Sequence, residues 1–175
     1  MKIGIFCSAN EQIDPDFFRM TEELGQWMGR NGHTVVFGGC NLGLMECVAK
    51  AAREAGGRTI GVIPTKVEKD GHVSEQMDVS IACDNLSDRK DLMLAHSDVC
   101  IALPGGIGTL DEVFTVAASN CIGYHAKRVI LYDMKGFWKP LTTLLDTLKQ
   151  QGFIRGDYQR QILTAHDLPE LISLL

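Results

Sequence analysis

Short apolar runs alternate with longer amphipathic segments along the whole chain. The short runs predict β-strands at residues 2–6, 34–37, 58–63, 79–83, 99–102, 128–132 and 162–164. In the segments between them apolar residues recur with helical spacing, which predicts helices at residues 15–30, 44–55, 86–96, 109–122, 140–150 and 168–174. This alternation indicates βαβ units and a parallel sheet. We therefore expect an α/β fold with three layers: a mostly parallel sheet of about seven strands with helices on both faces, and residues 1–175 as a single domain.

Two segments depart from this simple pattern. Residues 64–76 are polar and irregular, which predicts a mobile surface loop; one role open to such a loop is to cover a ligand. The helix predicted at residues 109–122 is apolar around most of its circumference. A helix of that kind is buried, either in the core or at a subunit interface.

Composition narrows the function classes. The net charge of −5 disfavours a general nucleic-acid-binding protein, which usually carries a basic excess. No apolar run approaches the roughly 20 residues that a membrane helix needs, and the N-terminus enters a strand pattern directly, without a signal-peptide cleavage region. The six cysteines contain no Cys-x-x-Cys pair, which favours free thiols in a reducing compartment over a zinc site. We expect a cytoplasmic protein.

Three loops follow predicted strands and should meet at one edge of the sheet, where α/β proteins bind ligands. They read CSAN at 7–10, GGCNLG at 38–43 and PGGIGT at 104–109. Neither glycine loop has the Gly-Lys-Ser/Thr of a Walker A motif or the Gly-x-Gly-x-x-Gly of a dinucleotide fingerprint. Each alone could be a tight strand-to-helix turn, but two in one small α/β protein favour a phosphate ligand.

The third loop opens the segment PGGIGTLDE at 104–112. Glycines between a strand and a helix let backbone amides approach an anion, and the helix N-terminus adds partial positive charge. Two acids, Asp111 and Glu112, stand beside this anion site. Thr109 and Glu112 also have the spacing of a capping box, which is the structural alternative. We expect Asp111 to be solvated and favourable to the helix dipole.

A carboxylate beside a phosphate site weakens binding unless it faces a developing positive charge. Cleavage of the N-glycosidic bond of a nucleotide supplies such a charge, because the ribose passes through an oxocarbenium-like state. Glu112 could stabilise that cation and orient or deprotonate a water. Arg89, at the start of a predicted helix, could reach a phosphate or ribose oxygen or pair with Glu112. Spacing alone favours a plain solvated helix face for residues 88–91.

These residues together resemble one family. Segment 104–112 is similar to the Pro-Gly-Gly-x-Gly-Thr-x-x-Glu signature of the Lonely Guy (LOG) family, often labelled "lysine decarboxylase". Arg89 and Lys90 match its Arg-Lys pair, segment 38–45 (GGCNLGLM) resembles its Gly-Gly-Gly-x-x-Gly-Leu-Met loop, and Cys7-Ser8 resembles its first-strand loop. The similarity runs through nearly the whole chain.

The resemblance implies a Rossmann-like fold and a homodimer with active sites near the subunit interface. It implies a phosphoribohydrolase that releases free base and ribose 5-phosphate from a purine ribotide, AMP or a cytokinin ribotide. It implies no metal or organic cofactor, and we expect neither nucleic acid nor membrane as a partner. The alternatives are a nucleotide-binding or sensing module without turnover and, disfavoured by the acidic charge, a DNA-handling relative.

The resemblance also assigns roles to residues. It places catalysis on Arg89 and Glu112. The residues that it implies for substrate binding lie on the three loops and at the starts of the helices that follow: Ser8, Gly39, Gly43, Met45, Lys90, Gly105, Gly106, Ile107, Gly108 and Thr109. Three residues depart from the family pattern: Cys40 replaces the third glycine, Glu46 a glycine after Leu-Met, and Ala118 a threonine. These departures bear on the substrate more than on the reaction type.

Overall fold

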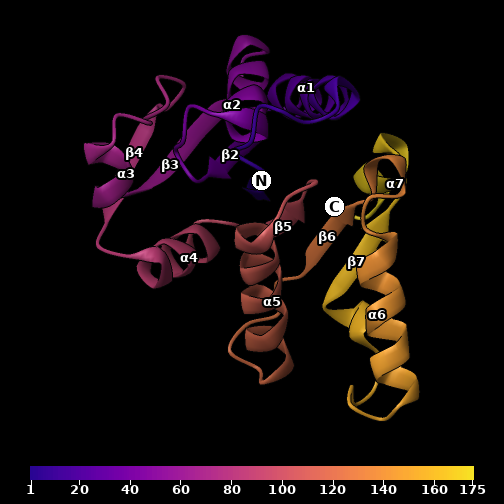
Figure 1. The fold of residues 1–175 in the computed structure, drawn as a ribbon. Helices are drawn as coiled ribbons and strands as arrows, with labels where there is room; N and C mark the ends of the chain where they lie inside the picture. The colour runs from indigo at the N-terminus through magenta and orange to yellow at the C-terminus, as the bar shows by residue number, and fades with distance from the viewer.

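All seven strands form one parallel sheet (Figure 1). The computed structural model describes residues 1–175 apart from the side chain of Val67. The strands are β1 (Lys2–Phe6), β2 (Thr34–Phe37), β3 (Arg58–Pro64), β4 (Val79–Cys83), β5 (Val99–Ala102), β6 (Val129–Tyr132) and β7 (Ile162–Ala165). Their order across the sheet is β4-β3-β2-β1-β5-β6-β7, and every neighbouring pair is parallel. The expected α/β architecture is confirmed, with a fully parallel sheet.

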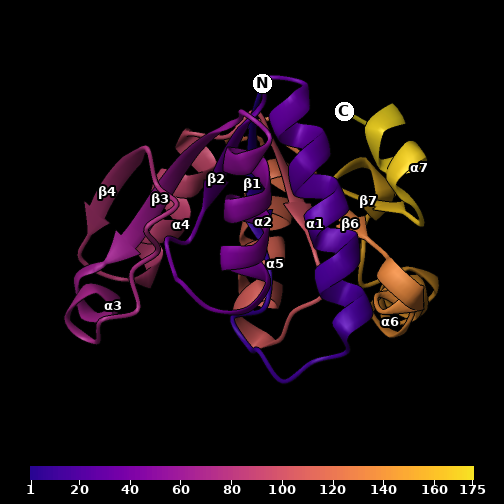
Figure 2. The same cartoon turned by 90° about the horizontal axis from the view of Figure 1, so that it is seen from above.

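Helices cover both faces of this sheet (Figures 1 and 2). They are α1 (Pro15–Arg30), α2 (Gly43–Glu54), α3 (Thr65–Lys69), α4 (Leu86–Ala95), α5 (Ile107–Cys121), α6 (Lys139–Gln150) and α7 (Leu168–Ser173). Helices α1, α2 and α7 pack on one face, and α4, α5 and α6 pack on the other. Within the described part of the chain, no helix is long and apolar enough to cross a membrane.

The strands are apolar on both sides because each face of the sheet has its own core. In β2, Val35 and Phe37 belong to the core under α1 and α2, whereas Val36 belongs to the core under α4 and α5. In β5, Ile101 belongs to the core under α1 and α2, and Cys100 belongs to the core under α4 and α5. Alternate residues of a strand point to opposite faces, so a strand covered on both sides reads as a continuous apolar run.

The strand order reverses next to β1, and this reversal positions the site. The chain builds outward from β1 through β4 and then returns to add β5 on the other side of β1. Ligands of open α/β sheets bind outside the carboxyl ends of the strands at such a switch point. The backbone amide of Ser8, after β1, donates to the carbonyl of Pro104, after β5, at 3.1 Å. The loops that follow these two strands therefore meet at the switch point.

Two sequence-based expectations are wrong in detail. Residues 64–76 are not one irregular loop, because β3 extends to Pro64 and helix α3 follows it directly. Helix α5 begins at Ile107, two residues before the predicted start at residue 109, with Gly106 as its N-cap. Glycines at 106 and 108 favoured a loop prediction, but packing of the later turns against the sheet extends the helix back through them.

Helix α5 is buried on one face only. Val113, Val116 and Ala117 pack in the core. Its other face is apolar and exposed in the single chain, and it continues into the following turn: Ile107, Phe114, Ala118, Cys121, Ile122 and Tyr124. The prediction that this helix is buried is therefore confirmed for its core face only, because its other apolar face is exposed in the single chain.

Candidate active site

A cavity of about 220 Å³ opens at the switch point. It is lined by residues from the loop after β1, from the starts of α2 and α4, and from the start of α5: Cys7, Ser8, Ala9, Met45, Arg89, Gly106, Gly108, Thr109 and Glu112. These segments are far apart in the sequence, and the parallel sheet brings them together by placing the carboxyl ends of its strands along one edge.

The N-terminus of α5 forms one wall of the cavity. Gly106 is the N-cap and has no side chain with which to cap the helix. The amides of Ile107, Gly108 and Thr109 belong to the first turn, where an α-helix offers no backbone acceptor. First-turn amides and the helix dipole together favour an anion at this position, and a phosphate group suits it.

Packing in the single chain does not require glycine at Gly106 or at Gly108. A Cβ atom built on Gly106 or on Gly108 would meet no heavy atom within 4 Å, and neither residue has a positive φ. Glycine at residue 108 also has a lower helix propensity than alanine. The space that these glycines leave open lies at the cavity and allows close approach of a ligand to the backbone.

Arg89 and Glu112 form a buried ion pair in the cavity. The Nη1 atom of Arg89 donates to Oε1 of Glu112 at 3.1 Å, and the two side chains are 13% and 6% exposed. Asn85 fixes the start of α4, because its side chain accepts from the amides of Ser87 and Asp88. The Nε atom of Arg89 is buried without a hydrogen-bond partner among the described residues. Arg89 therefore keeps donor capacity after it binds Glu112.

Burial dominates the ionisation of Glu112. Loss of solvent raises its pKa to about 7; Arg89 opposes the rise, and Asp111 adds to it less strongly. Near neutral pH this carboxyl group is therefore poised between its two protonation states. Tuning of this kind is typical of a group that exchanges a proton during a reaction.

A second pair lies beside the first, outside the cavity. Nζ of Lys90 contacts both carboxylate oxygens of Asp111 at 2.8 Å, and Asp111 is 52% exposed. A pair this exposed contributes about 0–1 kcal/mol. Asp111 is thus paired instead of freely solvated. The view of residues 88–91 as a solvated helix face is wrong for Arg89 and Lys90, which reach α5.

The capping-box alternative for Thr109 and Glu112 is also wrong. Both residues lie inside α5 because the helix begins at Ile107. The Glu112 carboxylate turns to Arg89 on α4. Thr109 is buried, and its Oγ1 atom fills the space at Gly105, where a Cβ would lie 2.1 Å from it.

Seven of the twelve residues predicted for the site line the cavity: Ser8, Met45, Arg89, Gly106, Gly108, Thr109 and Glu112. The other five lie around it. Gly39 is packed against Ile63, and Gly43 is packed against the backbone of Ser8 and Ala9. Gly105 is packed against Thr109. Lys90 is occupied with Asp111, and Ile107 is 84% exposed at the start of α5. Ala118 is exposed on the outer face of α5, away from the cavity lining.

Gly38 is a residue that the sequence reasoning missed. A Cβ at Gly38 would lie 1.6 Å from Nη2 of Arg89 and 3.1 Å from Sδ of Met45. The backbone of Gly38 is thus the surface on which the guanidinium group rests. Its position directly after β2, at the ligand-binding edge of the sheet, was the available signal.

The other chemistry near the cavity is limited. Burial raises the pKa of the Cys7 thiol well above its usual value, and Glu112 adds to the rise, which favours the protonated thiol over the nucleophilic thiolate. Among the described residues, no group of three or more His, Cys, Asp or Glu is arranged to hold a metal ion.

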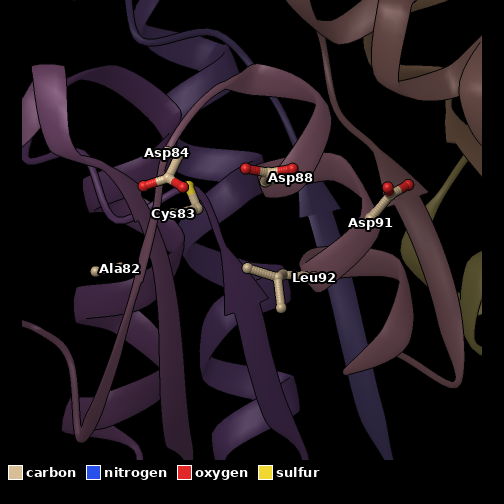
Figure 3. Close-up of a pocket in the computed structure, with 6 residues that line it drawn as sticks. All are labelled: Ala82, Cys83, Asp84, Asp88, Asp91 and Leu92. Atoms are coloured by element: carbon tan, nitrogen blue, oxygen red, sulfur yellow. The ribbon is translucent and has the colours of Figure 1, made fainter.

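A larger hollow of about 370 Å³ lies between the end of β4 and α4 (Figure 3). Its polar lining consists mainly of the carboxylates of Asp84, Asp88 and Asp91 (Figure 3). Three acids disfavour a phosphate ligand by like-charge repulsion. The smaller cavity at the switch point is therefore the better site for a phosphate ester.

Comparison with known proteins identifies one family. A family model described as "Possible lysine decarboxylase" matches residues 45–175. Cytokinin riboside 5′-monophosphate phosphoribohydrolase LOG5 of Arabidopsis thaliana is 32% identical over 174 residues, which are 99% of this chain and 76% of that protein. The cytokinin riboside 5′-monophosphate phosphoribohydrolase of Mycobacterium tuberculosis is 29% identical, over 97% of this chain and 90% of that protein.

Solved structures share the fold. The molybdenum cofactor binding protein of Rippkaea orientalis is 26% identical with a TM-score of 0.73, over 99% of this chain and 93% of that one. The Moco carrier protein of Chlamydomonas reinhardtii is 25% identical with a TM-score of 0.75, over the same shares of the two chains. The family model matches residues 45–175, and the relatives match nearly the whole chain. This chain therefore belongs to the LOG family, whose family model is described as "Possible lysine decarboxylase".

Proposed function

We propose that this protein is a phosphoribohydrolase that hydrolyses the N-glycosidic bond of a purine nucleoside 5′-monophosphate to free base and ribose 5-phosphate. The observation that carries the proposal is the buried pair of Arg89 and Glu112 beside the open N-terminus of α5. A protein that only bound phosphate would gain nothing from a desolvated carboxylate at that place.

The geometry suggests a division of roles. The phosphate lies on the amides of the first turn of α5, in the cavity that Arg89 also lines. The ribose then lies against Glu112, whose carboxylate stabilises positive charge at C1′ and accepts a proton from the attacking water. The water oxygen bonds to C1′ and the C1′–N bond breaks, with its electron pair leaving on the base. The proton that Glu112 took from the water then passes to the base nitrogen, directly or through solvent, which gives the free base and restores the carboxylate.

The cavity size limits what it encloses. At about 220 Å³ it is smaller than the roughly 300–1,000 Å³ of typical small-molecule pockets. We infer that the sugar phosphate fills the cavity and that the base lies at its mouth. Relatives named for cytokinin riboside 5′-monophosphates make AMP and its N6-prenylated derivatives the first substrates to try.

A panel of nucleoside 5′-monophosphates tests the proposal. We expect AMP or an N6-prenylated AMP to yield free base and ribose 5-phosphate in equal amounts, measured by chromatography. The matching nucleosides, which lack the phosphate, should react at least a hundredfold more slowly. If no member of the panel releases its base, the proposed activity is wrong.

The second candidate is a binding or carrier protein without turnover. The specific observation in its favour is the fold shared with molybdenum cofactor binding and carrier proteins at 25–26% identity. Calorimetry with AMP separates the two candidates: binding with no base released over a long incubation would favour a nucleotide-binding or sensing protein.

We further propose a homodimer built on the exposed face of α5. Ile107, Phe114, Ile122 and Tyr124 form an apolar surface there, and Ile107 adjoins the cavity. Burial of such a face contributes about 25 cal/mol per Å² of apolar area removed from water, and this contribution offsets the entropic cost of association. Sedimentation should therefore show a dimer that Phe114→Lys converts to a monomer, whereas Leu144→Lys on α6 should stay dimeric. A monomeric wild type would contradict this assignment.

The remaining sequence-based expectations are proposals too. We propose that residues 1–175 act as one domain, since all seven strands share one sheet. A cytoplasmic location is supported by six free cysteines, which suit a reducing compartment. The net charge of −5 supports a protein that does not bind nucleic acid, and the absence of salt-dependent binding to single-stranded DNA would test this.

A further inference from the structure

The glycine loop at residues 38–43 is held by a segment from elsewhere in the chain, residues 72–77. The carbonyl of His72 accepts from the amide of Asn41 at 3.3 Å, and Val73 forms an antiparallel bridge with Cys40. The amide of Ser74 donates to the carbonyl of Gly39 at 2.8 Å. This segment therefore fixes the backbone directly after β2.

Glu46 holds this segment in place. The buried hydroxyl of Ser74 donates to Oε2 of Glu46, in the first turn of α2, and accepts from the amide of Gln76 at 3.0 Å. Both hydrogen-bonding functions of the hydroxyl are thus used. Without the Glu46 carboxyl, the hydroxyl proton would lose its acceptor in a buried place. A glycine, which the resembled Gly-Leu-Met loop has at this position, would offer no such acceptor.

The contacts continue from Ser74 to the ion pair. Gly39 has a φ of +67°, and a Cβ there would lie 2.3 Å from Cγ1 of Ile63, so its backbone has little freedom. Gly38 precedes it and lies against the guanidinium group of Arg89. A shift of segment 72–77 would move Gly39 and Gly38 and would release Arg89 from its support.

We propose that Glu46 is a positioning residue: through Ser74 it fixes the Gly38-Gly39 backbone and so holds Arg89 where it meets both Glu112 and the phosphate of the substrate. This inference rests on the proposed function for the identity of the ligand. Cys40 and Glu46, two departures from the family pattern, thus act in the same unit, since Cys40 pairs with Val73 and Glu46 with Ser74.

Ribose 5-phosphate is the probe, because it fills the sugar phosphate site and needs no turnover. By calorimetry we expect Glu46→Ala and Ser74→Ala to weaken its binding about tenfold, the effect of losing one hydrogen bond to a charged group. Glu46→Gln keeps an acceptor and should stay within about threefold of wild type. Glu54→Ala, on an exposed part of the same helix, is the matched control and should bind as wild type does.

A double-mutant cycle separates positioning from general stability. In an Arg89→Lys background the guanidinium group is gone, so Glu46→Ala should weaken binding less than twofold further. Thermal unfolding of each variant verifies that it is folded at the temperature used. The proposal is overturned if Glu46→Ala binds as wild type does, or if its effect is unchanged in the Arg89→Lys background.

Failure of the Glu46 proposal can be distinguished from failure of the proposed hydrolysis. A wild type that binds ribose 5-phosphate but releases no base contradicts the proposed hydrolysis, and the Glu46 cycle still decides on positioning. A wild type that does not bind ribose 5-phosphate contradicts the phosphate site itself, and the role of Glu46 with it.

Discussion

Glu112→Gln is expected to lower kcat by about 10³-fold while it changes nucleotide affinity no more than a fewfold. The amide keeps the shape of the side chain and an oxygen for Arg89, but it carries no charge to stabilise the oxocarbenium-like state and accepts no proton from water. General base catalysis contributes about 10²–10⁴-fold. Turnover is measured by base release and affinity by calorimetry. Retention of more than a tenth of the wild-type kcat would remove Glu112 from the mechanism.

Asp111→Asn is the matched control for this variant. Asp111 is the neighbouring acid, but its carboxylate lies outside the cavity and pairs with Lys90. We expect its kcat to stay within threefold of wild type. Equal losses in the two variants would indicate a general effect of charge near α5 instead of a specific role for Glu112.

The raised pKa of Glu112 also predicts how the activity and the stability of the wild type depend on pH. Because its pKa is about 7 through burial, the reactive carboxylate is lost as pH falls, and kcat/KM of the wild type should decrease below about pH 7. The folded state binds the Glu112 proton more tightly than the unfolded state does. The free energy of unfolding that protonated Glu112 contributes therefore falls as pH rises from about 4.5 to about 7. The amount is on the order of 3 kcal/mol. Glu112→Gln should lack this change.

Arg89→Met is expected to lower kcat/KM by at least two orders of magnitude, because one side chain supports both the phosphate and Glu112. The variant should also be less stable at pH 8, by about 2 kcal/mol. Breaking a buried pair can cost about 3–5 kcal/mol, but Glu112 can take up a proton and limit the loss. At pH 5.5, where Glu112 is already largely protonated, the loss should be much smaller. Denaturant unfolding at pH 5.5 and at pH 8 measures the loss of stability at each pH.

Two further variants make this prediction specific. Lys90→Met breaks the exposed pair with Asp111 and should cost no more than about 1 kcal/mol at either pH. In Arg89→Met combined with Glu112→Gln, the pH dependence of the stability loss should disappear because no buried carboxylate remains. A loss in Arg89→Met that is the same at pH 5.5 and pH 8 would mean that the ion pair is not its cause.

The ligand-binding edge was predictable because its signals are local. The two glycine loops follow apolar runs that are recognisable as strands, and a parallel sheet aligns the ends of its strands. Helix boundaries were less accurate where glycine propensity competed with packing, as at Ile107. The short helix Thr65–Lys69 was missed because its five residues are too few to show a periodic pattern.

The sequence by itself determined the alternation of strands and helices, the parallel sheet, and the glycine loop with two acids directly after it, since each depends on residues close together along the chain. Only the tertiary structure decided which side chains meet. Arg89 and Glu112 are 23 residues apart, and Glu46 and Ser74 are 28 apart. Their contacts depend on the strand order β2-β1-β5 and on the path of the chain after β3, which bring separate helices and loops together. Spacing in the sequence does not encode such distances, because they are set by the packing of whole elements.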